Sequence, residues 1–314
     1  QRALKQLTCT RVLATCNINK PSVQRRLFSC RRQALLGAIS LLFFGLIAGQ
    51  SYATPPLEPR PATPLARIAI IIDDIGYHLG NGKRSLALPG DITLAIIPFT
   101  PHGRTLATMG ADQGKEIILH TPMSNASNTP METYALRGDM DRSTFLSHLR
   151  AGIEDIPHVS GLNNHMGSLL TQQSRPMQWL MNELKRQELF FVDSRTSAQS
   201  VAWDLARDSH IPTLKRDIFL DHEKNTEFIA AQFERLLQIA ETQGSAVGIG
   251  HPYPETLAYL ESQLPHLEAR GLALVPVSKL MEKRKKAPRA INNHRDSYDI
   301  DPVSVYDSYV KTWK

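Results

Sequence analysis

Short apolar runs alternate with amphipathic segments between residues 65 and 281. An apolar run of about four to eight residues is typical of a strand that is buried on both faces of a parallel sheet. We predict such strands at 68–72, 92–97, 116–119, 159–162, 189–192, 246–249 and 272–277, with a weaker one within 211–220.

Four segments between these runs have the periodicity of amphipathic helices, because their apolar residues recur every three or four positions. They span residues 145–153, 177–184, 228–240 and 257–267. We expect Ser143 to cap the first helix and Gly244 to end the third. Pro176 suits the first turn of the second helix, and Pro265 is expected to bend or break the fourth.

Repeated β-α units of this size predict an α/β fold with a parallel sheet. Seven or eight units favour a closed (β/α) barrel, regular or distorted, over an open doubly wound sheet. A dinucleotide-binding fold is disfavoured, because no Gly-rich turn directly follows the strand at 68–72.

The N-terminal segment, residues 1–53, contains eight Lys or Arg residues and no acidic residue, and its uncharged apolar run at 35–49 is followed by Ser51-Tyr52-Ala53. This order is typical of a secretory signal, which predicts export, to the periplasm or beyond, with cleavage near Ala53. The 15-residue run is shorter than the roughly 20 residues of a membrane span. An uncleaved anchor, the one expected membrane contact, stays open, as does a twin-arginine signal at Arg31-Arg32.

The charge and cysteine content of the chain change once the leader is set aside. Residues 54–314 carry 28 basic and 30 acidic residues, a net charge of −2, so the sequence gives no support for nucleic-acid binding. All three cysteines (Cys9, Cys16 and Cys30) lie in the leader, so any metal in the rest of the chain must be held by His and carboxylate groups. We expect a Pro-rich linker at 54–64, one catalytic domain at 65–281 and a disordered tail, or a partner-binding arm, at 282–314.

Reactive side chains follow five of the predicted strands. They are Asp73 and Asp74, His120, Asn164 and His165, Asp193 and Arg195, and His251 with Glu255. The carboxyl ends of barrel strands lie on one face, so these residues are expected to converge. Imidazoles and carboxylates on one rim indicate a hydrolase with a divalent metal.

Each of these residues also has a structural interpretation when it is considered alone. The Asp pair could cap a helix, a single His could be a hydrogen-bonded structural residue, Asp193 could serve a turn, and Arg195 could form a surface ion pair. The other histidines are interpreted as solvated, with His222 the one that stays open. The joint pattern at five strand ends is what favours a site.

Five motifs then carry a resemblance: IIIDDIG, LHTPM, GLNNHMGS, FVDSRTS and GIGHPYPETL, in this order. Together they resemble the divergent polysaccharide deacetylase family, an outlying branch of the NodB-type carbohydrate esterases, over residues 66–281. The resemblance implies a NodB-like, irregular (β/α) barrel of seven or eight strands.

The resemblance also implies roles for the residues at the strand ends. Asp73 matches the catalytic base, Asp74 and His120 match metal ligands, and His251 matches the final catalytic His. The second half of the family's His motif is missing, because positions 124 and 125 are Ser and Asn, and His165 is expected to replace that ligand.

We can write the expected chemistry from these roles. Zn²⁺, which we expect among the several divalent metals that His and Asp accept, would lower the pKa of bound water to about 7. Asp73 would accept the proton as this water attacks an N-acetyl carbonyl, and His251 would protonate the leaving amine. The metal, with a neighbouring donor such as Asn164 or a backbone N–H, would stabilise the oxyanion. Asp193, Arg195 and Glu255 are expected to bind substrate or orient the catalytic groups.

Three functions therefore stay open. The first is an exported metal-dependent hydrolase that removes N-acetyl groups from an envelope polysaccharide. The second is a catalytically degenerate relative that binds a glycan or an envelope protein, which the incomplete His motif favours. The third is a metal-free glycoside hydrolase that pairs Asp73 with Asp193 or Glu255.

Overall fold

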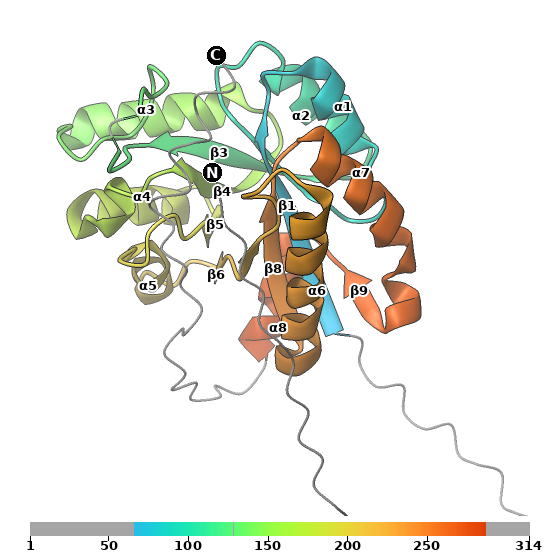
Figure 1. The fold of residues 1–314 in the computed structure, drawn as a ribbon. Helices are drawn as coiled ribbons and strands as arrows, with labels where there is room; N and C mark the ends of the chain where they lie inside the picture. The colour runs from blue at the N-terminus through green and yellow to red at the C-terminus, as the bar shows by residue number, and fades with distance from the viewer. Residues whose placement is uncertain (1–65, 128, 287–314) are drawn as a thin grey trace, which may run out of the picture. The chain divides into compact units, whose positions relative to one another are not determined.

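The computed structural model describes residues 66–127 and 129–286 (Figure 1). Within these residues a nine-stranded sheet is formed, and all of its strand pairs are parallel. The strands are β1 (Ala66–Ile75), β2 (Thr93–Ile96), β3 (Glu116–Met123), β4 (Val159–Met166), β5 (Phe190–Asp193), β6 (Thr213–Lys215), β7 (Ile218–Phe219), β8 (Ser245–Gly250) and β9 (Leu272–Leu274).

The order of the strands is β6-β5-β4-β3-β2-β1-β8-β7, and β9 also pairs with β1. β6 and β7 are the two ends of this order, yet only Arg216 and Asp217 separate them in the chain. Three Cα steps span at most about 11 Å, so the two edges must lie close together. The backbone N–H of Arg216 bonds to the β5 side of the seam and that of Asp217 to the β8 side. The sheet therefore curls into an irregular (β/α) barrel, which confirms the predicted fold class.

The helices connect successive strands (Figure 1). They are α1 (Leu79–Leu86), α2 (Gly103–Asp112), α3 (Arg142–Asp155), α4 (Ser174–Arg186), α5 (Ala202–Asp208), α6 (Thr226–Gln243), α7 (Pro254–Gln263) and α8 (Val277–Lys286), with 3-10 turns η1 (Leu170–Gln172), η2 (Leu264–His266) and η3 (Glu268–Arg270).

Two apolar clusters follow the alternation of side chains along the strands. On β1, Ile68, Ile70 and Ile72 belong to the larger cluster, which also contains the buried faces of most helices. Ala69 and Ile71 belong to a smaller cluster on the other face of the sheet, where α8 contributes Val277, Leu280 and Met281. Both faces of β1 are therefore buried, as its continuous apolar sequence predicts.

The predicted helix ends are right at three points and wrong at one. α6 ends before Gly244, whose φ of 80° is left-handed, and α7 ends before Pro265. Pro176 lies in the first turn of α4, as predicted. The N-cap of α3 is not Ser143 but Asp141, whose carboxylate accepts the backbone N–H of Thr144 at 3.0 Å. The carboxylate is the better cap because it accepts from both the N–H and the hydroxyl of Thr144.

Several predicted boundaries also differ from the structure. β1, β3 and β4 continue past their predicted ends, to Ile75, Met123 and Met166. The segment 211–220 forms two short strands, β6 and β7, because the chain passes from one edge of the sheet to the other within it. β9 ends at Leu274, since the following residues begin α8, and α8 continues to Lys286, into the segment predicted as a disordered tail. The leader, the linker and the tail from residue 287 on lie outside the described residues.

Within the described part of the chain, no helix has the length and apolar character that crossing a membrane requires.

Candidate metal centre and active site

Asp73 and Asp74 lie next to each other in β1, so a regular strand would point them to opposite faces. The pairing of β1 with β2 shifts by one residue between Ile72 and Ile75, which is a β-bulge. Asp74 also has a left-handed φ of 56°, a conformation that Asp tolerates better than most residues. This local irregularity lets both carboxylates approach His120: the Oδ2 of Asp73 lies 3.7 Å and the Oδ1 of Asp74 3.1 Å from His120 Nε2.

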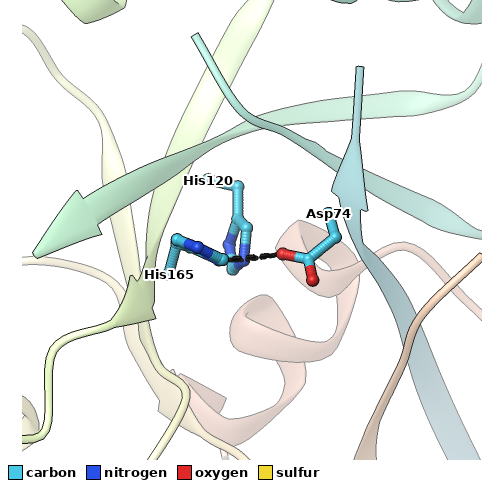
Figure 2. A group of neighbouring side chains, drawn as sticks. All are labelled: Asp74, His120 and His165. Carbon is cyan, nitrogen blue, oxygen red and sulfur yellow. Dashed lines mark hydrogen bonds and ion pairs between the residues drawn. The ribbon is translucent and has the colours of Figure 1, made fainter. Parts of the chain in front are cut away.

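Asp74, His120 and His165 turn their polar atoms towards one another (Figure 2). The Oδ1 of Asp74 lies 2.8 Å from His165 Nδ1, and His165 Nδ1 lies 3.1 Å from His120 Nε2. One ligand atom from each of the three residues lies within 4.8 Å of the other two. Three strands, β1, β3 and β4, supply these residues, so the group depends on the fold and not on local sequence.

The three residues fit a divalent metal. The Oδ1 of Asp74 is buried and has no hydrogen-bond partner, although two imidazole nitrogens lie close to it. Burial would raise the pKa of Asp74, but the charge and proximity of His165 and His120 outweigh it and hold the pKa well below its usual value. An ionised carboxylate oxygen and two imidazole nitrogens form the N/O ligand set of catalytic zinc sites, with a fourth position left open.

Asn163 connects the two parts of the site. Its side-chain Nδ2 donates to Asp73 Oδ1 at 2.8 Å, and its Oδ1 lies 2.7 Å from Nδ1 of His120. The Nδ1–H of His120 therefore donates to Asn163, which leaves Nε2 as the nitrogen available to a metal. Burial raises the pKa of Asp73, and the nearby His120 and His251 offset only part of this rise.

His251 and Asp221 form a buried pair at the end of β8. The Nδ1 of His251 lies 2.9 Å from Asp221 Oδ1, and the backbone N–H of His251 donates to Oδ2 at 2.6 Å. The hydroxyl of Thr256 also donates to Oδ2, at 2.7 Å. Burial lowers the pKa of His251, but Asp221 outweighs it, and the net effect raises the pKa to about 9. The other ring nitrogen, Nε2, lies 3.9 Å from Asp74 Oδ2. It faces the group formed by Asp74, His120 and His165, here called the metal group.

Asn164 does not supply the expected oxyanion donor. Its Nδ2 donates to the carbonyl of Met166 at 2.7 Å and to Thr196 Oγ1 at 3.3 Å, and its Oδ1 accepts the N–H of Ser194 at 2.9 Å. Both amide hydrogens are used to hold the loops after β4 and β5. Alternation along β4 explains this, because Asn163 and His165 share one face and Asn164 lies on the other.

Asp193 and Arg195 do not orient His251 or Asp73, contrary to expectation. The buried carboxylate of Asp193 accepts the N–H of Arg195 at 2.8 Å, the hydroxyl of Ser200 at 2.7 Å and the N–H of Trp203 at 3.3 Å. Asp193 therefore organises the loop between β5 and α5, which is the turn interpretation of this residue. The orienting partners of His251 and Asp73 are instead Asp221 and Asn163.

Glu255 is exposed in the first turn of α7, and among the described residues no hydrogen bond or ion pair joins it to the metal group. His222 packs against Phe228, with ring centroids 4.5 Å apart, and burial lowers its pKa. Its neighbour Asp221, rather than His222 itself, bonds to a site residue.

Glu132 is a further residue that the sequence did not reveal. Its Oε1 accepts the hydroxyl of Tyr77 at 3.3 Å and lies 3.9 Å from His165 Nε2. Its Oε2 is buried and has no hydrogen-bond partner. The loop between β3 and α3 places it there, and no apolar periodicity marks that loop.

The fold and the site together define a class of protein. It is a curled parallel α/β barrel whose carboxyl edge carries an Asp/His/His group between a buried Asp and a buried His–Asp pair. Residues 70–281 match the divergent polysaccharide deacetylase family. The chain belongs to this family, as the sequence motifs predict.

Two relatives and one solved structure are similar to the chain. The uncharacterized protein YibQ of Escherichia coli (strain K12) is 36% identical over 217 residues, which covers 69% of this chain and 68% of the relative. An uncharacterized protein of Haemophilus influenzae is 35% identical over 223 residues, covering 71% and 79%. The crystal structure of an uncharacterized Agrobacterium tumefaciens C58 protein has a TM-score of 0.67 at 22% identity, covers 71% of this chain and 92% of that one, and shares the fold.

Proposed function

We propose that this protein is an exported, metal-dependent hydrolase that removes N-acetyl groups from an envelope polysaccharide. The observation that carries the proposal is the convergence of Asp74, His120 and His165 between Asp73 on one side and the His251–Asp221 pair on the other. Membership of the deacetylase family supports the same reaction.

Asp74, His120 and His165 would hold the metal, and Zn²⁺ suits this N/O ligand set best. When bound, such an ion polarises a carbonyl oxygen and lowers the pKa of water. Asn163 and Glu132 act on the ligands: the first fixes the tautomer of His120, and the second lies beside the outward nitrogen of His165.

Asp73 is the proposed general base. Its Oδ1 is held by Asn163, while its buried Oδ2 has no hydrogen-bond partner and is free to accept a proton. Burial raises its pKa, which makes the carboxylate a stronger base than an exposed Asp.

His251 is the proposed general acid. Asp221 keeps its pKa at about 9, so the imidazolium form predominates at neutral pH and Nε2 carries a proton. That nitrogen faces the metal group, where the leaving amine of the sugar would form. An amine is a poor leaving group, and a positioned acid contributes about 10²–10⁴-fold to such a step.

The two alternatives differ in the support that they have. The glycoside hydrolase needs a second carboxylate opposite Asp73, but Asp193 is occupied by three hydrogen bonds and Glu255 is exposed outside the group. The binding-only alternative rests on the incomplete His motif, and His165 offers the missing imidazole from another strand.

The test is acetate release from N-acetylchitopentaose by the zinc-supplemented protein, with Asp73→Asn and His251→Ala as variants. We expect release by the wild type, and a loss of about 10²-fold or more in each variant. Calorimetry with the same glycan provides the control, because the variants should still bind it. Binding without acetate release by the wild type would support the binding-only alternative and contradict a hydrolase.

Export is proposed from the leader alone. We expect the mature protein in the periplasmic fraction, with Thr54 as its first residue, and N-terminal sequencing checks this. A chain that keeps residues 1–53 and stays in the membrane fraction would point to an uncleaved anchor.

A further inference from the structure

Aromatic side chains are exposed at the same edge of the sheet as the metal group. Among the described residues, the large hydrophobic side chains with high exposure are Tyr77 (39%), Phe99 (45%), Tyr134 (43%) and Leu169 (42%). The three aromatic ones follow β1, β2 and β3, which are neighbours in the sheet. Exposed aromatic rings that gather at one place on a surface commonly mark a binding site.

Phe99 and Tyr134 form a pair of rings. Their centroids lie 4.3 Å apart, and their planes are inclined by 33°. Phe99 has a left-handed φ of 60°, which is strained for a bulky residue, and its N–H donates to Asp155 Oδ2 at 2.7 Å. Backbone strain of this kind concentrates at functional sites. Core packing does not explain the strain, since the ring of Phe99 is exposed.

The ring pair is joined to the metal group by two residues. Tyr134 lies two positions after Glu132, whose Oε1 is 3.9 Å from His165 Nε2. The hydroxyl of Tyr77, three positions after Asp74, donates to the same oxygen at 3.3 Å. The rings therefore lie near the proposed active site, at the same edge of the sheet.

The ring pair offers a flat apolar surface near the candidate metal site. Such a surface matches a pyranose ring, which presents axial C–H groups on its faces. A free acetyl group or a small amide would make little use of it.

We propose that Phe99 and Tyr134 form a subsite that binds a sugar ring of the glycan beyond the residue that is deacetylated. This inference rests on the proposed function, and it adds which side chains bind the chain next to the reacting sugar. The protein should then prefer longer chains, because only these reach both the metal group and the ring pair.

The experiment compares the binding of N-acetylchitopentaose and of N-acetylglucosamine to the zinc-supplemented protein by calorimetry. The wild type should bind the pentamer at least about tenfold more tightly than the monomer. Phe99→Leu and Tyr134→Leu keep an apolar side chain but lose the ring, and each should remove most of this preference. Phe99→Tyr and Tyr134→Phe keep the ring and should retain it.

Two controls make the result decisive. Unchanged melting temperatures would show that the Leu variants are folded, and acetate release from the pentamer by the wild type reports separately on the proposed function. A chain-length preference that depends on the rings, without acetate release, would uphold the subsite and contradict the hydrolase.

Acetate release with equal affinity for monomer and pentamer would support the hydrolase and contradict the subsite. Equal losses in the Leu variants and the ring-keeping variants would overturn the subsite, as would a wild type that binds neither sugar. A shift of sedimentation coefficient in the Leu variants alone would assign the rings to self-association instead.

Discussion

Asp221 is the charged group with the largest effect on the ionisation of His251. Burial works against the imidazolium, yet the carboxylate 2.9 Å from Nδ1 raises the pKa of His251 to about 9. Asp73 and Asp74 add smaller contributions in the same direction. The same pair of residues also fixes the ring, because the carboxylate holds both Nδ1 and the backbone N–H.

Asp221→Asn should therefore lower the pKa of His251. The amide keeps the shape of Asp221 but not its charge, and burial then favours the neutral imidazole, so we expect a fall of about one unit or more. NMR titration of the metal-free protein measures it directly. Because the protonated acid is the active form, the alkaline limb of the pH–rate profile should move to lower pH.

Asp208→Asn, at an exposed carboxylate on α5, is the matched control and should leave the titration of His251 unchanged. An unaltered pKa of His251 in the Asp221 variant would show that burial and the other carboxylates, not Asp221, determine it.

At the residue scale, the sequence predicts which side chains gather at the site when each of them closely follows a predicted strand. Asp73, Asp74, His120, His165 and His251 meet this condition, and the structure brings them together in the carboxyl-terminal parts of β1, β3 and β4 and after β8. Alternation along β4 could have distinguished Asn163 from Asn164. Asp221 directly follows the apolar run Ile218-Phe219-Leu220 at the end of the weaker predicted strand, so the same rule could have found it.

At the scale of elements, α3 and α4 are neighbouring helices (Figure 1). A buried carboxylate joins them. The side chain of Glu183 on α4 is 4% exposed. Its carboxylate accepts two hydrogen bonds from Arg150 on α3, one from Nε and one from a terminal nitrogen, both at 2.9 Å. Arg186 and Gln187 also donate to it. Hydrogen bonds from the two guanidinium groups outweigh burial and hold the pKa of Glu183 well below its usual value.

Glu183→Gln should destabilise the fold by about 1–3 kcal/mol at neutral pH, since the amide cannot accept the same charged hydrogen bonds. Because the pKa of Glu183 is lower in the folded than in the unfolded protein, its ionised carboxylate stabilises the fold at pH values above the unfolded pKa near 4.5. This stabilisation is lost as the pH falls towards the folded pKa. The difference between wild type and variant should therefore narrow from about pH 5 to about pH 3. Urea unfolding measures both quantities.

Glu154→Gln removes the same charge from an exposed position of α3 and should have little effect. An equal loss of stability in the two variants, or a difference in stability that does not change with pH, would show that the Arg150–Glu183 hydrogen bonds between α3 and α4 do not stabilise the fold.

The elements themselves were predictable where the pattern was long. α6 has a complete apolar stripe and a Gly after its end, so its existence and its C-terminal end follow from the sequence, whereas its N-cap, Asn225, was not predicted. The short elements were not predictable from the sequence. α1, α2 and α5 have few apolar positions, and β6 and β7 depend on neighbouring strands for their hydrogen bonds. The bulge that turns Asp74 into the site is likewise a property of strand pairing, invisible in one strand alone.

At the scale of the whole barrel, closure explains how the site is assembled. The candidate metal ligands come from β1, β3 and β4, and the His–Asp pair comes from β8 and the end of β7. β8 pairs directly with β1, so His251 Nε2 lies 3.9 Å from the carboxylate of Asp74. β2 and β3 separate β4 from β1 in the sheet order, and curling of the sheet is what brings His165 Nδ1 to 2.8 Å from Asp74 Oδ1.

We propose that this edge of the barrel holds a divalent metal through Asp74, His120 and His165. The most direct measurement is elemental analysis of the purified protein after incubation with zinc and removal of the excess, for wild type, His165→Ala and His210→Ala. The last variant alters an exposed His on the loop after α5. We predict about one metal ion per chain in the wild type and in His210→Ala, and almost none in His165→Ala. A wild type that stays empty, or a His165→Ala protein that keeps its metal, would contradict the account.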